Sequence, residues 1–137
     1  MATVMVFGTY DLLHAGHEFF LRQAKKHGDR LLVCVARDKT VIKLKGTIPV
    51  EPELKRLAKL QSLPFVDDVV MGSEGDKYAC IERYKPDIIC LGYDQTYFTD
   101  NLEEELKQRG LSTKVIRIKE RFQPEKFKSS KLRAGKV

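Results

Sequence analysis

Strand-like and helix-like segments alternate along this chain of 137 residues. Thr3–Phe7 is a short apolar run that ends at Gly8. Arg30–Ala36 contains the continuous apolar run Leu31-Leu32-Val33-Cys34-Val35, which is typical of a strand buried on both faces of a parallel sheet. Similar runs predict three more strands, at Val66–Met71, Asp87–Leu91 and Thr113–Ile118.

Amphipathic segments between these runs predict helices. His17–Lys26 places Phe20, Leu21 and Ala24 on one face, and Gly28 follows its end. After the second strand comes a polar segment that contains Lys43, Lys45 and Gly46. Pro52 then opens a helix. Further helices are predicted at Lys77–Tyr84, at Leu102–Gln108 and as a short piece after Ser129-Ser130.

This alternation predicts an α/β fold, a Rossmann-like, doubly wound, five-stranded parallel sheet with helices on both faces. The length suits a single domain over residues 1–137. In such sheets, ligands bind beyond the carboxyl ends of the strands. Gly8–His17 and Gly92–Gln95 both follow predicted strands, so we expect these two loops to face one cleft.

The composition, 42% hydrophobic and 32% charged, is that of a soluble globular protein. The net charge of +6 is unevenly distributed. Residues 1–100 hold 14 basic and 14 acidic side chains, whereas residues 101–137 hold 11 basic and 5 acidic ones. Such a basic end suits nucleic acid, a membrane surface or a small polyanion such as a nucleoside triphosphate, and charge alone does not choose among them.

Cysteine usage indicates a reducing compartment. The three cysteines show no C-x-x-C spacing, which argues against a disulfide framework. Cys34, Cys80 and Cys90 lie in apolar runs, so all three are predicted to be buried, inert thiols. No apolar run approaches membrane-spanning length, and Met1–Phe7 lacks the basic start of a signal peptide. We therefore expect a cytoplasmic protein with no membrane partner.

The run Gly8-Thr9-Tyr10-Asp11-Leu12-Leu13-His14-Ala15-Gly16-His17 carries the strongest chemical signal. A small-residue turn between a strand and a helix presents backbone N–H groups and the positive helix end to phosphate. Two histidines at i, i+3 add imidazole donors, which suit the charge that develops on phosphorus during nucleotidyl transfer. No third ligand is evident for a zinc ion shared by this pair. Nucleotide chemistry is the first hypothesis.

This run resembles the G-T-F-D-x-x-H-x-G-H signature of the cytidylyltransferase-like nucleotidyltransferases. The resemblance extends along nearly the whole chain, through Lys45-Gly46, Arg56, Val66-Asp67-Asp68-Val69-Val70, Leu91-Gly92-Tyr93-Asp94 and Ser129-Ser130. It implies transfer of a nucleoside monophosphate from a nucleoside triphosphate to a phosphate-bearing acceptor, with release of pyrophosphate. It also implies Mg²⁺ as the divalent metal and a homodimer.

The resemblance assigns roles to individual residues. The catalytic set is His14, His17, Lys45 and Arg56, and Asp11, Lys45 and Arg56 contact the acceptor. Asp11 is the metal ligand. The nucleotide-binding set is Gly8, Thr9, Tyr10, His14, Gly16, His17, Gly92, Asp94, Ser129 and Ser130.

Each of these side chains also has a plainer structural interpretation. The histidines and Asp11 are suited to capping a helix or a turn, and Ser129 and Ser130 to capping a helix. Asp94 is suited to an Asx turn. The lysines, including Lys43 as a second candidate beside Lys45, are suited to a solvated surface.

Two kinds of family member remain in competition. Small cytidylyltransferases that act on glycerol 3-phosphate have this length, but they usually close with R-T-x-G-I-S-T, whereas here Arg121 lies eight residues before Ser129. Archaeal-type FAD synthases, which transfer AMP from ATP to FMN, resemble Val35–Val41, Lys43–Gly46 and Leu91–Thr96 more closely. ATP and FMN are the preferred substrates, and CTP with glycerol 3-phosphate or a similar phosphorylated alcohol is the alternative.

A non-catalytic nucleotide- or nucleic-acid-binding module is the alternative from a different class. It requires aromatic residues interleaved with basic ones for base stacking. Only Phe122 and Phe127 meet this requirement in the basic end. We therefore expect no nucleic-acid partner.

Overall fold

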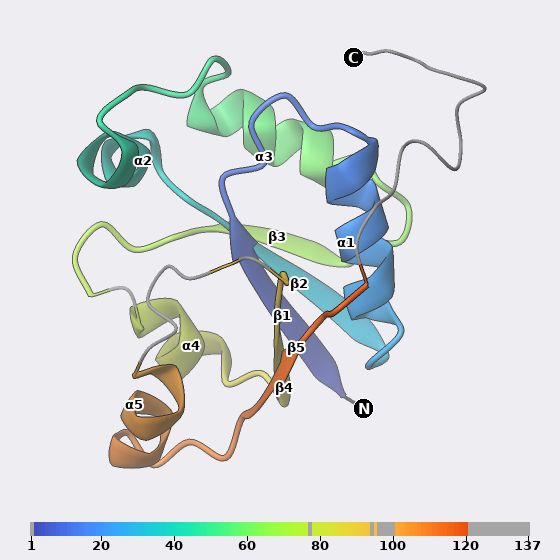
Figure 1. The fold of residues 1–137 in the computed structure, drawn as a ribbon, viewed down its shortest axis with the longest axis vertical. Helices are drawn as coiled ribbons and strands as arrows, with labels where there is room; N and C mark the ends of the chain where they lie inside the picture. Colours follow the sequence, from blue (N-terminus) through green and yellow to red (C-terminus); the bar gives the residue numbers. More distant parts are fainter. Residues whose placement is uncertain (1, 77, 94, 96–100, 121–137) are drawn as a thin grey trace.

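A computed structural model describes residues 2–76, 78–93, 95 and 101–120. Its five strands are parallel and lie in the order β3-β2-β1-β4-β5 (Figure 1). They are β1 (Thr3–Gly8), β2 (Arg30–Val35), β3 (Asp68–Met71), β4 (Ile88–Leu91) and β5 (Lys114–Arg117). The order reverses direction between β1 and β4, so the topological switch point of the sheet lies at these two strands.

Helices cover both faces of the sheet. They are α1 (Ala15–Lys25), α2 (Asp38–Lys45), α3 (Glu53–Gln61), α4 (Ala79–Tyr84) and α5 (Leu102–Gln108). Figure 1 shows α1 and α3 on one side of the sheet and α4 and α5 on the other. This arrangement confirms the doubly wound α/β fold. In the described part of the chain, no helix has both the length and the apolar character needed to cross a membrane.

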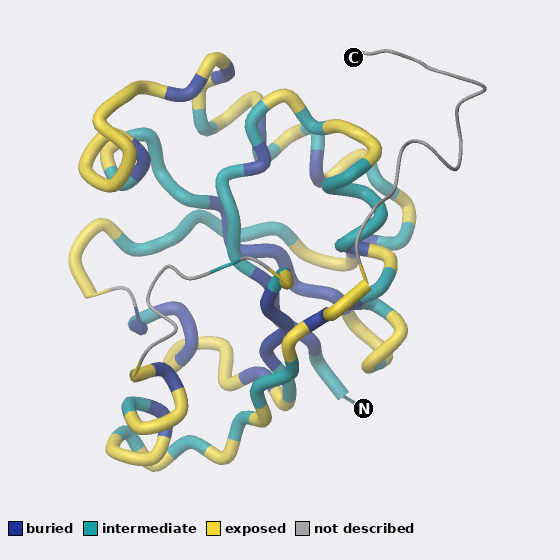
Figure 2. The backbone as a smooth tube through the Cα atoms, in the orientation of Figure 1, coloured by how far each residue is buried: buried dark blue, intermediate teal, exposed yellow. Residues whose placement is uncertain are grey.

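The two faces of the strands supply two separate apolar clusters. Successive side chains of a strand point to opposite faces. Val4, Val33 and Leu60 accordingly belong to one cluster, between the sheet and α1 and α3. Met5 and Leu32 belong to the other, which includes residues of α4 and α5. The buried strands at the centre of the molecule are visible in Figure 2.

The structure differs from the predicted elements mainly at α2, which occupies the segment interpreted as polar. Only Val41 of this helix is buried, while Ile42 and Leu44 are exposed, so its sequence lacks the apolar periodicity that predicts a helix. Gly46, with φ of 77°, ends the helix in the left-handed conformation. The short helical piece expected after Ser130 lies outside the described residues.

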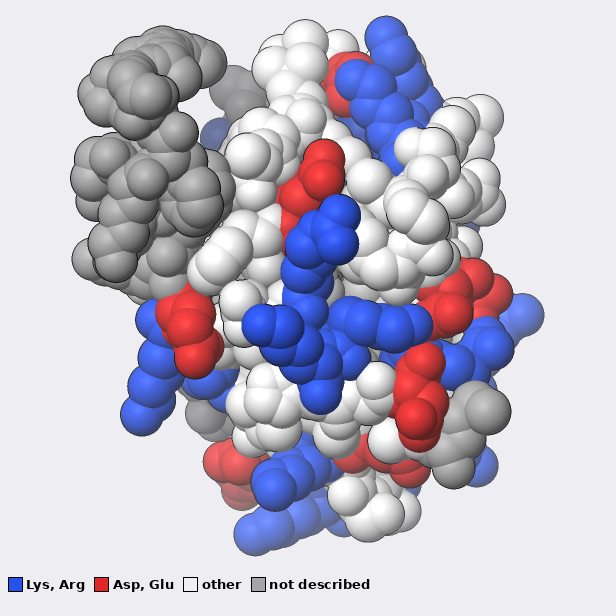
Figure 3. Space-filling view, turned by 90° about the vertical axis from the view of Figure 1, so that its right-hand side faces the viewer, with Lys and Arg blue, Asp and Glu red and all other residues white. Residues whose placement is uncertain are grey.

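The side of the molecule that carries α1 gathers Lys and Arg side chains, with acidic ones at the margins (Figure 3). Among the described cations of α1, Lys25 pairs with Asp67 at 2.6 Å. The guanidinium of Arg22 lies 4.3 Å from the ring centroid of Phe65. These contacts join α1 to the segment around β3, so this part of the basic surface has a structural use.

Candidate functional site

A cavity of about 880 Å³ lies at the carboxyl ends of the strands. It is bordered by Phe7–Asp11 at the end of β1 and just after it, by the first turns of α1, and by Ala36, Ser73 and Gly92 after β2, β3 and β4. Nine residues proposed from the sequence line it: Gly8, Thr9, Tyr10, Asp11, His14, Gly16, His17, Lys45 and Gly92. The structure thus brings both expected loops to one cavity. Asp94, Ser129 and Ser130 lie outside the described residues.

His14 and His17 cap the N-terminus of α1 reciprocally. Nδ1 of His14 accepts hydrogen bonds from the backbone N–H of Gly16 at 3.0 Å and of His17 at 3.4 Å. Nδ1 of His17 accepts from the backbone N–H of His14 at 3.3 Å. The two rings stack with their centroids 3.8 Å apart. This capping also explains why α1 begins at Ala15, two residues before the predicted start.

The capping bonds determine which nitrogen of each neutral ring holds the proton. A nitrogen that accepts a hydrogen bond is unprotonated, so Nε2 is the N–H donor of both His14 and His17. Burial, followed by the neighbouring His14, lowers the pKa of His17 to about 4. Near pH 7 His17 is therefore a neutral imidazole with a single donor, Nε2–H.

Tyr10 packs against the histidine pair through the ring of His17. It adopts a positive φ of 54°, which costs of order 1 kcal/mol in a residue other than glycine. Its buried ring meets His17 edge-on, at 5.4 Å between centroids. A Cβ on Gly8 would lie 2.7 Å from this ring, so position 8 has no room for a side chain. Burial raises the pKa of Tyr10, so its phenol remains neutral.

Asp11 anchors the loop between α2 and α3. Its carboxylate accepts hydrogen bonds from the backbone N–H of Val50 at 2.8 Å and of Glu51 at 3.0 Å. Burial opposes ionisation, but these bonds, together with the charge of Arg56, hold the pKa of Asp11 below its usual value. Asp11 thus has a turn-holding role besides the metal-binding role predicted for it.

The prediction for Arg56 requires a correction. We expected its guanidinium to contact the acceptor phosphate, but the side chain has no exposed surface. Nη1 donates to the carbonyl oxygens of Thr9 and Ala36, both at 2.8 Å. Nε donates to the carbonyl oxygen of Glu51 at 3.0 Å, and Nη2 pairs with Asp38 at 2.7 Å. Because these acceptors hold the guanidinium inside the protein, Arg56 clamps three segments together rather than facing a ligand.

Glu51 extends the same clamp and was not identified from the sequence. The residue is 5% exposed. Oε1 accepts from the backbone N–H of Leu12 at 3.2 Å, and Oε2 forms an ion pair with Lys59. The hydrogen bond from Lys59, against the opposing effect of burial, lowers the pKa of Glu51. An acidic residue beside a proline is a common surface pattern, so the sequence contains no signal for this role.

Lys45 is the exposed cation of the site. It is the last residue of α2, and it lines the cavity. Its charge is one of the smaller contributions that lower the pKa of His17. Lys43, the second candidate, is exposed on the same helix. The missed helix α2 also places Thr40 and Leu44 on the cavity wall.

Gln95 joins β4 to β1 across the switch point. Nε2 of its side chain donates to the carbonyl oxygen of Phe7 at 3.2 Å, and Oε1 accepts from the backbone N–H of Gly92 at 3.1 Å. Arg117 donates to the carbonyl oxygens of Gly92 at 2.6 Å and Gln95 at 2.9 Å. The sequence pattern indicated the Gly92–Gln95 loop but neither these contacts of Gln95 nor Arg117, because three of the four bonds join residues 22 to 88 positions apart.

Asp11 is the predicted metal ligand among the described residues of the site. Within the described ranges, no three His, Cys, Asp or Glu side chains gather as a metal site would require. Asp11 is a carboxylate on the cavity wall, and each oxygen keeps a lone pair beyond its backbone bond. This donor fits Mg²⁺, which is commonly held by one or two carboxylates, waters and substrate phosphates.

Comparison with known proteins places these features in a family. The family model described as Cytidylyltransferase-like matches residues 5–135. An FAD synthase of Pyrococcus horikoshii is 43% identical over 130 residues, which are 94% of this chain and 88% of that protein. An FAD synthase of Archaeoglobus profundus is 45% identical over 132 residues, 96% of this chain and 84% of that protein.

Solved structures agree with this assignment of the fold. A protein from Thermoplasma volcanium, described as a lipopolysaccharide core biosynthesis protein, has a TM-score of 0.84 and 41% identity, covering 90% of this chain and 99% of that one. A pantoate-beta-alanine ligase from Francisella tularensis has a TM-score of 0.61 and 18% identity, covering 90% and 60%. The second likeness concerns the fold alone.

Proposed function

This chain belongs to the cytidylyltransferase-like family, and from that premise we propose that it is an FAD synthase. It transfers AMP from ATP to FMN and releases pyrophosphate. The observation that carries this conclusion is 43–45% identity to FAD synthases over 94–96% of the chain. The chain is accordingly a nucleotidyltransferase, and the cytidylyltransferase and non-catalytic alternatives are not favoured.

In the proposed reaction, a phosphate oxygen of FMN attacks the α-phosphorus of ATP in line with the departing pyrophosphate. The attacking phosphate is already ionised, so the reaction needs no general base. Negative charge grows on the α-phosphate oxygens and on the leaving group. The Nε2–H donors of His14 and His17 suit this charge, and the capping bonds at Nδ1 hold both rings in position before the substrate arrives.

Other groups around the cavity complete the proposed site. Lys45 supplies a positive charge for phosphate oxygens, and the turn at Gly8 and Thr9 lies where a phosphate would meet the end of α1. Asp11 would hold Mg²⁺, which when bound neutralises phosphate charge. Arg56 acts through Thr9 as a positioning residue. Asp94, Ser129 and Ser130 keep their predicted nucleotide-binding role.

The direct test is pyrophosphate release with each nucleotide and acceptor. We expect turnover with ATP, FMN and Mg²⁺ together, and formation of FAD by chromatography. Turnover confined to CTP and glycerol 3-phosphate would instead support a cytidylyltransferase. Salt-dependent oligonucleotide binding with no pyrophosphate release from any nucleotide would support the binding module.

The histidine roles have their own test. His17→Ala should lower kcat by on the order of a hundredfold, as expected for loss of one preorganised donor. Circular dichroism and the melting temperature control for the lost cap on α1. Full turnover by a folded His17→Ala protein would contradict the assigned role.

We further propose that the protein is a cytoplasmic homodimer, as the resemblance implies. Exposed apolar side chains on and beside α2 support an interface there: Leu12, Ile42, Leu44, Ile48, Val50 and Leu54. Light scattering during size-exclusion chromatography measures the mass, for comparison with 15.7 kDa for one chain. A monomer across the working concentration range would remove this proposal.

A further inference from the structure

Two of the three cysteines lie side by side in the wall of the proposed nucleotide cavity. Sγ of Cys34, near the end of β2, is 3.5 Å from Sγ of Cys80, in the first turn of α4. The two residues are 4% and 6% exposed, and both line the cavity. Cys90, on β4, has no exposed surface and belongs to the apolar cluster on the opposite side of the sheet.

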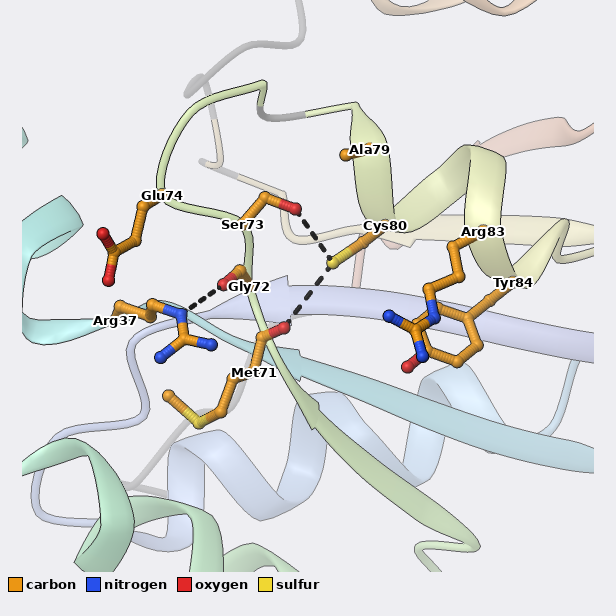
Figure 4. Close-up of a pocket in the computed structure, with 9 residues that line it drawn as sticks. All are labelled: Arg37, Met71, Gly72, Ser73, Glu74, Ala79, Cys80, Arg83 and Tyr84. Carbon is orange, nitrogen blue, oxygen red and sulfur yellow. Dashed lines mark hydrogen bonds between the residues drawn. The ribbon is translucent and has the colours of Figure 1, made fainter.

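Cys80 lies in the wall between two cavities. Besides the nucleotide cavity it borders a smaller one of about 380 Å³, which is formed by Met71–Glu74, Arg37 and the outer side of α4. Figure 4 shows its sulfur facing the Ser73 hydroxyl and the Met71 carbonyl oxygen, at 3.8 and 3.6 Å. A small solute therefore has two routes to this sulfur.

The surroundings of the pair make Cys80 the more readily ionised of the two thiols. The Cys34 thiol donates its hydrogen bond to the sulfur of Cys80. This bond, against the opposing effect of burial, lowers the pKa of Cys80, and the hydroxyl of Ser73 acts in the same direction. The bond to Cys80 and burial raise the pKa of Cys34, so this residue keeps its proton. The thiolate is the reactive form of cysteine, so the pair has one nucleophile and one resolving thiol.

From this geometry we propose that Cys34 and Cys80 form an oxidisable dithiol, which hydroperoxides convert to a disulfide that slows nucleotidyl transfer. The sulfur of Cys80 attacks a peroxide oxygen, the O–O bond breaks, and a sulfenic acid and one water (or alcohol) result. The sulfur of Cys34 then attacks the sulfur of Cys80; the S–S bond forms and a second water leaves. Two thiols are oxidised and one peroxide is reduced.

The disulfide would distort the wall of the nucleotide cavity. Its sulfur atoms must approach from 3.5 Å to about 2.05 Å, a relative movement of about 1.5 Å. This movement pulls Cys80 away from Ser73 and Met71, which follow β3 beside the cavity. A misplacement of about 1 Å near reacting groups costs on the order of a hundredfold in rate. We therefore expect the oxidised protein to lose at least about tenfold in turnover.

The experiment treats the whole reduced protein with hydrogen peroxide, with and without ATP and Mg²⁺. Titratable thiols should fall from three to one, and the mass should fall by about 2 Da for two hydrogen atoms lost. Peptide mapping should recover Cys34 linked to Cys80. ATP should slow the reaction by covering the wall, and dithiothreitol should restore turnover.

Matched variants locate the effect. Cys90→Ala removes a thiol outside the pair and should keep the full response. Cys34→Ala and Cys80→Ala should form no intramolecular link, and the melting temperature checks their folding. If either variant does not fold, peptide mapping of the parent and of Cys90→Ala still identifies the linked residues.

Several results would overturn the inference. These are a link through Cys90 or between chains, a gain in mass without a disulfide, and a Cys34–Cys80 link that leaves turnover unchanged. The effect on rate rests on the proposed function, whereas the linked peptide is measured independently of it. A reduced protein that forms no FAD therefore rejects the proposed function, and with it only the consequence for rate.

Discussion

Two arginines hold together two different regions of this molecule, and they do so in different ways. Arg56 has no exposed surface and donates to three backbone carbonyl oxygens and the carboxylate of Asp38. The side chain of Arg109 is 23% exposed, and it pairs with the carboxylates of Asp76, Glu82 and Glu105 at 2.9 Å each.

The difference lies in what each guanidinium holds and how much water competes for it. The acceptors of Arg56 belong to the turn after β1, the β2–α2 junction and the segment before α3, so its loss would separate three walls of the site. Arg109 links α5 to α4 and to the loop before it, where solvent screens each ion pair. We therefore expect burial, rather than the number of partners, to determine which arginine the fold depends on.

Replacing Arg56 should cause the larger loss of stability of the two arginines. Arg56→Ala leaves buried carbonyl oxygens and Asp38 without their partner, and we expect a loss of about 3 to 5 kcal/mol in the free energy of unfolding. Urea denaturation followed by circular dichroism measures it. Arg56→Lys keeps the charge but not the fork of donors, so it should be intermediate. A fully stable Arg56→Ala protein with a raised KM for FMN would restore the acceptor-phosphate role.

Glu51 and Glu105 allow the same comparison of a buried and a more exposed position, with smaller expected losses of stability. Glu51→Ala removes the acceptor for Leu12 and the partner of Lys59 in a buried position, and we expect it to cost about 1 to 3 kcal/mol. Glu105→Ala removes one partner of Arg109 at a partly exposed position of α5, with an expected cost below about 0.5 kcal/mol. Equal costs for the two variants would show that burial does not separate the two regions.

As the pH falls, the stability contributed by His17 at the start of α1 should be lost before that contributed by the Arg109 ion pairs. The pKa of His17 is about 4 in the folded protein, below that of an unfolded histidine, so the unfolded chain takes up the proton first. Stability from this group is complete above about pH 6.5 and falls as the pH decreases toward 4. The hydrogen bond from Arg109 lowers the pKa of Asp76, so that contribution falls only below about pH 4. Melting temperatures of the parent and of His17→Gln between pH 7 and pH 3.5 measure the difference, and identical curves would contradict it.

The smallest expected effect is that of salt on Arg109. Arg109→Ala should cost about 1 kcal/mol or less for each exposed ion pair, and the cost should shrink in 1 M NaCl, where screening acts over about 3 Å. The cost of Arg56→Ala should change little with salt. Denaturation of both variants at low and high ionic strength compares the two directly. If the loss in free energy of unfolding caused by Arg109→Ala did not change with salt, Arg109 would behave like the buried Arg56.

Local patterns predicted much of the fold and the position of the site. The apolar runs of β1 and β2, and the turn from Gly8 to His17, are signals carried by neighbouring residues. The same approach missed α2, because that helix has one buried residue and packs little apolar surface. The reciprocal histidine cap contains a histidine at a position where Ser, Thr, Asp or Asn is usual, so the start of α1 was placed two residues late.

The sequence by itself determined the alternation of strands and helices, and the turn at which imidazole donors meet a helix end, because these depend on residues close together in the chain. The tertiary structure alone decided what Arg56 and Cys80 contact. The acceptors of Arg56 at Thr9 and Ala36 are 47 and 20 positions away, and the sulfur beside Cys80 is 46 positions away. A buried guanidinium and an exposed one are identical in sequence. Only the packing that removes water from one of them distinguishes a structural clamp from a phosphate ligand.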